Sequence, residues 1–241
     1  MIERHLMKLR ARDDLTDEEE QAIRSAVADV KEVSADQVYV RAGDPLTAAT
    51  LLLDGIMCRA KDLRNGERQI SELNVAGDFV DVHGFTLKQL DHNLITLTDC
   101  RVASVPHARL REITEAFPHL ARLYWFGTNL DAAIHREWEL SLGRRTAYAR
   151  IAHLFCELRA RLELVGLADG DGYDLAVTQG DIAECMGLTP VHVNRMLKQL
   201  REEGLVEFRD RRVAILDWEG LARAGEFDPS YLYLGRRPRE D

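Results

Sequence analysis

The chain of 241 residues has no apolar run of the roughly eighteen residues that a membrane-spanning helix needs. Its N-terminus, MIERHLMKLRARDD, is too charged for a secretory signal, so we expect a cytoplasmic protein with no membrane association. The four cysteines are scattered without CxxC spacing, which argues against a metal centre and a disulfide framework. No GxSxG, HExxH or glycine-rich phosphate loop occurs, so an enzyme is not expected.

Acidic residues outnumber basic residues, 41 to 32, so the formal net charge is −9. An acidic total does not exclude a nucleic-acid partner, since salt screens charges that lie more than about 8 to 10 Å apart. A local basic face can therefore coexist with it. Apolar residues make up 46% of the chain, enough to bury real cores, and the length favours two domains.

The most informative segment is 178–216, where two short helices are predicted to meet at a glycine. A first helix over 179–186 would end at Gly187, which can adopt a left-handed cap without strain. Thr189 can then cap a second helix through its hydroxyl, with Pro190 at the first helical position, where no N–H is needed. This layout predicts a helix–turn–helix.

In the second helix, Val193, Leu197 and Leu200 share one face and are predicted to pack inward. The opposite face carries basic and amide side chains, as expected of a helix that enters a DNA major groove. Arginine can bind guanine with two hydrogen bonds, and asparagine can pair with adenine in the same way. The candidate operator-reading residues are Thr189, Pro190, Val191, His192, Asn194 and Arg195.

A β-hairpin is predicted next, from apolar runs at 205–208 and 213–216 around the sequence Arg-Asp-Arg-Arg. Its arginines would contact DNA phosphates as a wing. The alternative is an αα-hairpin with a solvated charged face, but the short turn and the appended basic hairpin favour a winged helix. The candidate backbone contacts are Gln179, Lys198, Arg209, Arg211 and Arg212.

The first half of the chain has a different pattern of predicted secondary structure. Thr16 and Glu19 form a capping-box pattern that opens a helix. From residue 33 to residue 103, short β-rich runs alternate with turn pairs about eleven residues apart, which predicts a small antiparallel, jelly-roll-like β-roll. These turns are Gly43-Asp44, Asp54-Gly55, Asn65-Gly66 and Gly77-Asp78.

A long helix follows Phe117-Pro118, with a near-heptad seam. The seam could pack on the roll of the same chain, but a twofold dimer helix suits a DNA reader better. Gly143 to Arg145 would form the hinge, and Thr146 would cap a further helix over 147–164. The seam residues, and hence the predicted dimer interface, are Leu120, Leu123, Gly127, Leu130, Ile134 and Trp138.

The predicted fold is α+β: a β-roll sensor domain (1–116), a dimerisation helix with hinge (117–143) and a winged helix–turn–helix domain (144–241). This order, with GDFVDVHGF, GRRTAYARIAHLFCELRARL and LTPVHVNRMLKQLREEGLV, resembles the Crp/Fnr family of bacterial transcription regulators over nearly the whole chain. The resemblance implies a cyclic-nucleotide-binding-type roll. It also implies a homodimer that binds a palindromic operator in double-stranded DNA, with half-sites about 34 Å apart, and acts with RNA polymerase.

Two departures from the family pattern bear on function. Arg195 matches the family's recognition-helix arginine, but Val191 replaces the acidic residue four positions earlier and offers an apolar contact, such as one to a thymine methyl. In the roll, Asp81-Val82 stands at the Gly-Glu pair of cyclic-AMP-binding members, and His92-Asn93 at their Arg-Ser pair. Since an acceptor, a guanidinium and a hydroxyl are missing, the effector is expected to be unknown or absent and not cyclic AMP.

Other sensing mechanisms remain as alternatives. The absence of cysteine before residue 58 argues against the family's iron–sulfur cluster, whereas His83 lies near the position of the haem ligand in CO-sensing members. Acidic and histidine residues around it could also suggest a metal site, although three or four ligands would have to converge. A cyclic-nucleotide-type module that binds protein is a further alternative. The candidate effector-pocket residues are Asp81, Val82, His83, His92 and Asn93.

Overall fold

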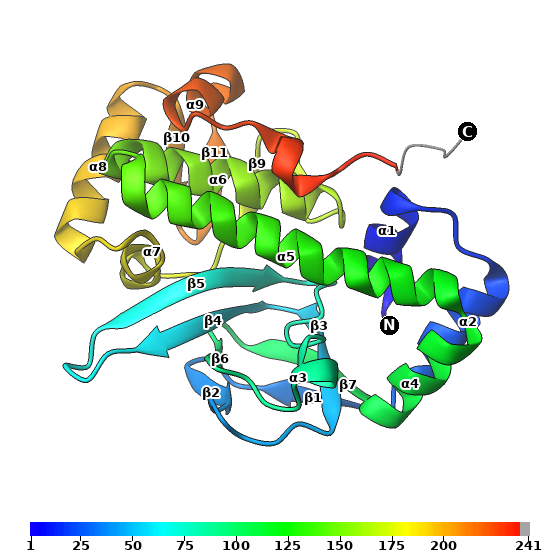
Figure 1. Ribbon diagram of the computed structural model, residues 1–241. Helices are drawn as coiled ribbons and strands as arrows, with labels where there is room; N and C mark the ends of the chain where they lie inside the picture. The colour runs from blue at the N-terminus through cyan, green and yellow to red at the C-terminus, as the bar shows by residue number, and fades with distance from the viewer. Residues whose placement is uncertain (237–241) are drawn as a thin grey trace. The chain divides into compact units, whose positions relative to one another are not determined.

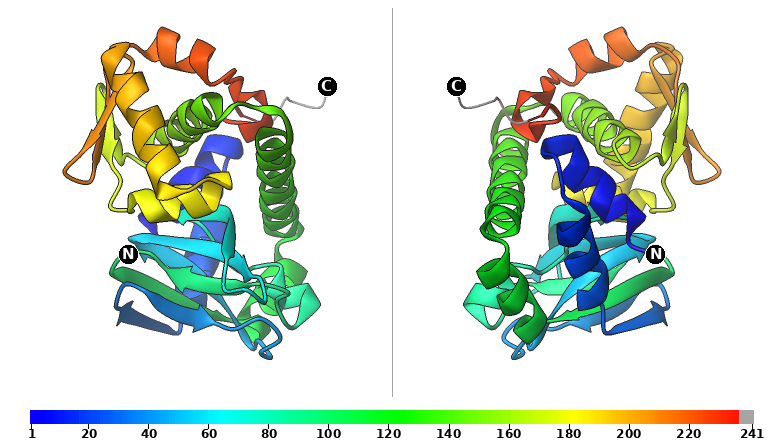
Figure 2. Two further views of the ribbon diagram at one scale, coloured as in Figure 1. Left: turned by 90° about the vertical axis from the view of Figure 1, so that its left-hand side faces the viewer. Right: turned by 90° about the vertical axis from the view of Figure 1, so that its right-hand side faces the viewer.

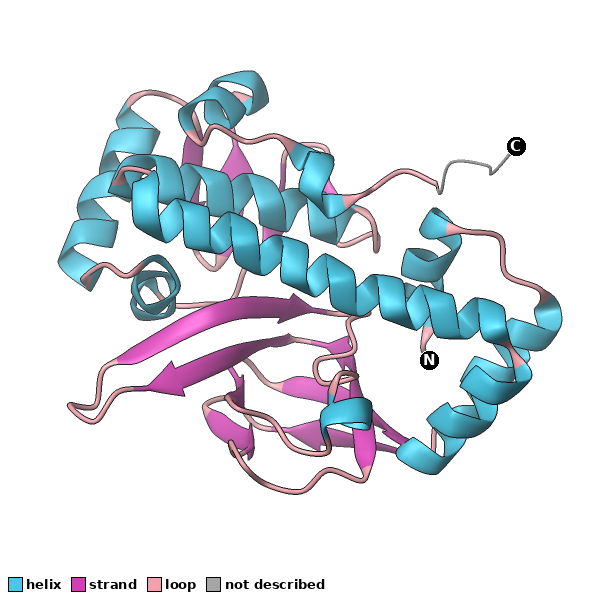
Figure 3. Cartoon of the chain, viewed as in Figure 1, coloured by secondary structure: helices cyan, strands magenta, loops and turns pink. Residues whose placement is uncertain are grey.

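The computed structural model describes residues 1–236, and their contacts form two compact units. Unit 1 comprises 1–59, 73–132 and the segment from residue 233 onward, and unit 2 comprises 60–72 and 133–232. The division falls inside the long helix α5 (Pro118–Arg144). Helices and antiparallel strands are mixed, which confirms the predicted α+β fold (Figures 1 and 3). Residues 237–241 of the third predicted domain lie outside the described residues.

Two sheets form the predicted β-roll. The register is antiparallel between β1 and β7, between β3 and β7, and between β2 and β6. One sheet has the order β1-β7-β3, from β1 (Asp29–Val33), β7 (Cys100–Pro106) and β3 (Ala48–Asp54). The other has the order β2-β6-β4-β5, from β2 (Gln37–Val40), β6 (Asn93–Thr96), β4 (Ile56–Asp62) and β5 (Arg68–Val75).

Glycines stand at the predicted turns for a backbone reason. Gly43, Gly55, Gly66 and Gly77 all have φ between 86° and 98°, which side-chain-bearing residues rarely adopt. At Gly55 the space is closed as well, because a Cβ atom would lie 2.5 Å from the carbonyl oxygen of Asp99. The regular turn spacing in the sequence therefore marked real strand ends.

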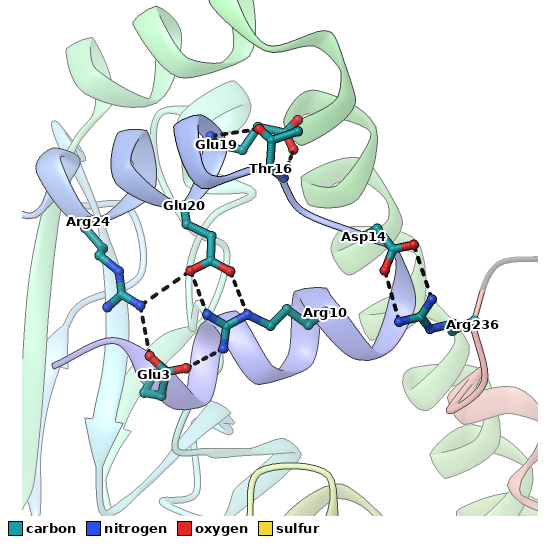
Figure 4. A network of polar contacts seen from close by, with 8 residues as sticks. All are labelled: Glu3, Arg10, Asp14, Thr16, Glu19, Glu20, Arg24 and Arg236. Atoms are coloured by element: carbon teal, nitrogen blue, oxygen red, sulfur yellow. Dashed lines mark hydrogen bonds and ion pairs between the residues drawn. The ribbon is translucent and has the colours of Figure 1, made fainter.

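Four helices complete unit 1 beside α5: α1 (Glu3–Arg12), α2 (Asp17–Ala26), α3 (Gly84–Leu87) and α4 (His107–Ala116). The capping box of α2 is present as predicted: the Glu19 amide donates to Thr16 Oγ1 at 3.2 Å, and the Thr16 amide donates to Glu19 Oε2 at 3.0 Å (Figure 4). Helix α1 was missed, although Ile2, Leu6 and Leu9 share a face and are buried.

Unit 1 buries two apolar clusters. One cluster lies between the helices and the three-stranded sheet, and includes Leu6, Ile23, Leu51 and Leu110. The other fills the interior of the roll with Leu52, Met57, Val80, Leu90, Leu94, Cys100 and Val102. Leu87, at the end of α3, lies outside both clusters and is 62% exposed.

Four charged side chains link α1 to α2 on the surface and form what we call the α1–α2 ion-pair network (Figure 4). The Arg10 guanidinium contacts Glu20, with Nε to Oε1 at 2.6 Å, and also donates to Glu3. Arg24 Nη2 lies 2.9 Å from Glu3 Oε2 and 3.5 Å from Glu20 Oε2. The two arginines hold the pKa of Glu20 below its usual value, Arg10 more strongly than Arg24.

In unit 2, α6 packs against α8 and α9, and α7 packs against α8 (Figures 1 and 2). Thr146 caps α6 as predicted, accepting from the Ala149 amide at 3.2 Å. The helices are α6 (Ala147–Glu163), α7 (Gln179–Met186), α8 (Pro190–Glu202), α9 (Trp218–Ala224) and the 3-10 helix η1 (Pro229–Leu232). The strands are β8 (Ala168–Asp169), β9 (Gly172–Asp174), β10 (Val206–Arg209) and β11 (Arg212–Ile215), in the sheet order β10-β11-β9-β8.

Strands β8 and β9 lie in the segment 165–174, for which the sequence predicted only a connection. Gly172 shows why this segment needs glycine: a Cβ atom there would lie 2.1 Å from the carbonyl oxygen of Val213 on β11. The turn-rich sequence Asp-Gly-Asp-Gly was the available signal for a hairpin. The wing is thus part of a four-stranded sheet rather than an isolated hairpin.

Candidate nucleic-acid interface

Helix α7 begins and ends where the sequence placed it. Thr178 Oγ1 accepts from the Asp181 amide at 3.1 Å, and Asp181 Oδ2 accepts from the Thr178 amide at 2.7 Å, a capping box that sequence reasoning did not use. Gly187 ends the helix in the left-handed region with φ of 61°, as predicted. The Arg150 guanidinium of α6 donates to the Met186 carbonyl at 2.9 Å, so α6 is hydrogen-bonded to the end of α7.

Helix α8 starts at Pro190 after Thr189, whose Oγ1 accepts from the His192 amide at 3.2 Å. Both the cap and the proline position were predicted. The predicted inward residues of α8 are buried, and Met196, which was not assigned to that face, is buried with them. The buried residues of α8 are Val193, Met196, Leu197 and Leu200.

The outward face of α8 carries the predicted mixture of apolar, amide and basic groups. Val191 is 81% exposed, which is an unusual position for a valine. Asn194, Arg195 and Lys198 are exposed beyond it, and Lys198 Nζ lies 3.6 Å from Glu202 Oε1. Thr189 and Pro190 are exposed at the start of the helix, while His192 is half-buried.

The wing has a tighter turn than the sequence suggested. Strands β10 and β11 include Arg209 and Arg212 as an opposed pair, so only Asp210 and Arg211 form the loop. Both loop residues have positive φ, 49° and 61°, which matches the right-handed twist of a two-residue hairpin. Arg211 is thereby exposed at the tip.

Arg212 differs from the other wing arginines. Its Nη2 lies 2.5 Å from Asp169 Oδ2 and its Nη1 lies 3.2 Å from Asp174 Oδ1, so its charge is balanced by β8 and β9. The hydrogen bond from Arg212 lowers the pKa of Asp169. The Arg212 guanidinium thus links β11 to β8 and β9, and phosphate contact by Arg212 stays a prediction.

A buried polar cluster, the Glu157 network, supports these elements from inside unit 2. Glu157 on α6 is fully buried, and its Oε2 accepts from Trp138 Nε1 at 3.0 Å and from the Tyr231 hydroxyl at 2.8 Å. Its Oε1 accepts from Arg161 Nη1 at 3.1 Å. Sequence reasoning missed this network, since Trp138 and Tyr231 lie 19 and 74 residues away.

The predicted hinge, Gly143 to Arg145, makes an ion pair and several hydrogen bonds with its neighbours. Helix α5 continues through Gly143 and Arg144, and Arg145 is 6% exposed with its Nη2 2.6 Å from Glu137 Oε1. Arg150 Nη2 and Nε donate to the carbonyls of Leu142 and Arg145, at 2.8 and 3.0 Å. These contacts all lie within unit 2, so the end of α5 is held firmly to α6.

The residues of the predicted dimer seam differ in how far the protomer buries them. Leu120 and Leu123 are buried in the unit 1 core, and Ile134 and Trp138 are each 3% exposed within the protomer. Gly127 and Leu130 are half-buried. The seam residues share a helix face that the protomer buries at both ends and leaves half-buried in the middle, so its role in dimerisation stays a prediction. Helix α5 instead exposes Arg122, Trp125, Asn129, Arg136 and Leu140, with Trp125 66% exposed.

Two of the predicted effector residues, Asp81 and Asn93, form hydrogen bonds with backbone amides of unit 1. Asp81 is fully buried, and its Oδ1 accepts from the Thr50 amide at 2.5 Å. Burial raises the pKa of Asp81 to about 6, against the hydrogen bond from Thr50 and the charge of nearby Arg59. Asn93 Oδ1 accepts from the Ala42 amide at 2.9 Å. These polar atoms hold backbone in place, and the adjoining interior is filled with apolar side chains.

The remaining members of the predicted pocket do not converge on a common cavity. Val82 packs against the unit 1 core, and His83 stands at the start of α3. The His83 and His92 rings lie 5.4 Å apart between centroids, and His92 Nδ1 lies 2.9 Å from Asp91 Oδ1. Within residues 1–236, no three or more His, Cys, Asp or Glu side chains are grouped to hold a metal ion. A cyclic nucleotide does not fit the residues present, because Val82 offers no acceptor for a ribose hydroxyl and His92 and Asn93 offer no guanidinium and hydroxyl for the phosphate.

Comparisons with known proteins agree with this architecture. The family model described as Crp-like helix-turn-helix domain matches residues 149–224, and the one described as Cyclic nucleotide-binding domain matches residues 30–117. The transcriptional activator protein FnrL of Cereibacter sphaeroides is 27% identical over 205 residues, which cover 83% of this chain and 81% of FnrL. The transcriptional activator protein Anr of Pseudomonas aeruginosa is 24% identical over 203 residues, 84% of this chain and 83% of Anr.

The solved structure of FixK2 from Bradyrhizobium japonicum has a similar fold, with a TM-score of 0.73 at 24% identity, covering 82% of this chain and 97% of FixK2. A roll, a long helix and a winged helix–turn–helix with an exposed basic and amide face define a DNA-binding transcription regulator. The chain belongs to the Crp/Fnr family, whose members are transcription regulators rather than enzymes. The described helices include none that is both long and apolar enough to span a membrane.

Proposed function

We propose that the protein acts as a homodimer that reads a palindromic operator, with α8 of each copy in a major groove. The observation that carries this proposal is the outward face of α8, where Val191, Asn194 and Arg195 are exposed and nothing in the described chain covers them. Val191 would contact a thymine methyl, Asn194 an adenine and Arg195 a guanine. Thr189, Pro190 and His192 lie at the groove edge in this arrangement.

The phosphate backbone would be held by groups that flank this face. Lys198 lies one turn beyond Asn194, and Arg211 projects from the wing tip. Arg209 is exposed on β10, with Nε 2.9 Å from Glu207 Oε1, and would exchange that surface partner for phosphate. Gln179 lies at the N-terminus of α7, where the helix dipole also favours a phosphate.

The dimer would form through the exposed face of α5. Trp125, with Arg122 one turn before it and Asn129 one turn after it, offers an apolar centre flanked by polar groups. Two copies related by a twofold axis would present two α8 helices to half-sites about 34 Å apart. The operator-bound dimer would then act on RNA polymerase in the cytoplasm.

The protein would bind its operator without an added cyclic nucleotide. The roll interior is filled and Asp81 is turned into the sheet, so we propose that no effector or an unidentified one controls DNA binding. An effector could act only by binding the DNA-competent form more tightly than the other form. Haem bound through His83 is the alternative that the family resemblance suggests.

Selection of bound DNA from a random pool by the purified protein tests the proposal. We expect a twofold symmetric site that is enriched without added ligand, with binding that weakens steeply as salt rises. Replacing Arg195→Ala should cost about 1–3 kcal/mol at one base pair, whereas Lys198→Ala should weaken all sequences alike and lower the salt slope by about one. An unchanged sequence preference in Arg195→Ala would show that α8 does not dock as proposed.

A further inference from the structure

Asn194 is not a free amide on the surface of α8. Its Nδ2 donates to Gln179 Oε1 at 3.3 Å, across the turn that separates α7 from α8. The two residues are 15 apart in sequence and both belong to unit 2. Gln179 is half-buried at the first position of α7, while Asn194 is exposed in the second turn of α8.

A primary amide has two N–H donors and one carbonyl acceptor. The bond to Gln179 uses one Nδ2–H of Asn194, and leaves the second Nδ2–H and Oδ1 available. Adenine presents an acceptor at N7 and a donor at N6 in the major groove, and these two groups match what remains of Asn194. The contact to Gln179 is therefore compatible with a two-bond contact to adenine.

We infer that Gln179 is a positioning residue that fixes the amide of Asn194 for one adenine in each half-site; this inference rests on the proposed function. A side chain that is not already held loses rotamer freedom when it is immobilised at an interface. The bond to Gln179 removes part of that loss before DNA arrives. The same bond fixes which way the amide faces, so that thymine, with an acceptor at O4, is disfavoured at that position.

The two amides on α8 differ in a way that supplies a control. Gln199 Nε2 donates to Glu203 Oε1 at 2.9 Å, one turn further along the chain, so its amide is held from α8's own end rather than from α7. Gln179→Glu offers a second test, since a carboxylate keeps an acceptor for Asn194 but loses the Nε2 donors and adds negative charge beside the phosphates.

The experiment measures competition binding of operator duplexes in which each base pair is changed in turn, with wild type, Asn194→Ala, Gln179→Ala, Gln179→Glu and Gln199→Ala. We expect Asn194→Ala to lose roughly tenfold discrimination for adenine at one base pair, and Gln179→Ala to lose roughly threefold at that same pair. Gln179→Glu should bind all duplexes more weakly but keep the adenine preference. Gln199→Ala should keep both, and Gln179→Ala should add no loss at that pair to Asn194→Ala.

The inference is overturned if Gln179→Ala weakens all duplexes equally, which is the behaviour of a residue that only contacts phosphate. It is also overturned if Asn194→Ala changes no base preference, or if Gln179→Glu loses the adenine preference as fully as Gln179→Ala. Circular dichroism and thermal unfolding of each variant separate these outcomes from a loss of folding. A wild-type protein without sequence preference would instead contradict the proposed function itself.

Discussion

Two networks of charged side chains, one in each unit, differ in how far they are buried. In unit 1, the α1–α2 ion-pair network lies at the surface, and the Arg10 side chain is 40% exposed. In unit 2, the Glu157 network lies inside, with Glu157 fully buried and Arg161 6% exposed. Exposed ion pairs contribute little because water and salt screen them, whereas a buried charge is costly unless all its bonds are made.

This difference indicates what each network does. The exposed network adds small increments of stability to the joining of α1 and α2. The buried network fixes one geometry among the C-terminal part of α5, helix α6 and η1, because any other geometry would leave Glu157 without Trp138, Arg161 or Tyr231. The support behind the DNA-reading helices is therefore specified by polar contacts as well as by apolar packing.

Glu157→Ala should have the largest effect on folding. It removes the acceptor shared by the buried Trp138 indole, the buried Arg161 guanidinium and the half-buried Tyr231 hydroxyl, and removal of one partner of a buried charge typically costs about 3–5 kcal/mol. Urea unfolding of the full chain measures the change. Glu163→Ala, at an exposed position at the end of α6, is the matched control and should change stability by less than about 0.5 kcal/mol. Equal effects in both variants would contradict the role given to the network.

Asp81→Asn tests whether burial alone makes a charged group costly to stability, because Asp81 is buried but lies in unit 1. Burial raises the pKa of Asp81 from its usual 3.8 to about 6, so the folded state holds the proton more tightly than the unfolded state. Its contribution to stability is fully present below pH 4 and is lost as pH rises through 6. One pKa unit corresponds to about 1.4 kcal/mol, so the loss is roughly 3 kcal/mol.

The measurement is the difference in unfolding free energy between Asp81→Asn and wild type from pH 3.5 to pH 7.5. An asparagine keeps an oxygen for the Thr50 amide but does not ionise, so the variant should gain relative to wild type as pH rises between 4 and 6. A difference that is constant across this range would show that Asp81 titrates normally in the fold.

Trp138→Phe should have a smaller effect. Phenylalanine keeps most of the apolar contact but lacks the indole N–H that donates to Glu157 Oε2, so one bond to a buried carboxylate is lost while Tyr231 and Arg161 remain. Hydrogen bonds to charged groups are worth about 1.5–3 kcal/mol. The double variant with Glu157→Ala should lose less than the sum of the two single losses. Additive losses would indicate that Trp138 acts by packing alone.

The sequence predicted well wherever a local backbone requirement chose the residue. Gly187 with φ of 61°, Thr189 at the cap and Pro190 at the first position of α8 all follow from the geometry of a few neighbouring residues. The same is true of the turn glycines of the roll, which mark the ends of β2, β3, β4 and β5. The outward face of α8 followed from its apolar periodicity.

The sequence predicted poorly wherever the partner was distant. The spacing from Leu120 to Trp138 showed that the residues share a face of α5, but could not show how far their own chain buries it. The ion-pair partners of Arg212 were equally invisible, because Asp169 and Asp174 lie 43 and 38 residues earlier in the sequence. The Asn194–Gln179 contact was invisible for the same reason.

Arg10→Ala should give the smallest effect, and it completes the comparison of the two networks. The guanidinium bridges Glu3 and Glu20, but all three side chains are partly exposed, so the expected loss is about 0.2–1 kcal/mol at low salt. At about 1 M salt the screening length falls to roughly 3 Å, and most of the loss should vanish. The loss in Glu157→Ala should persist at that salt concentration, since its partners are shielded from ions. A salt-independent loss of several kcal/mol in Arg10→Ala would mean that the surface network, like the buried one, specifies how its helices pack.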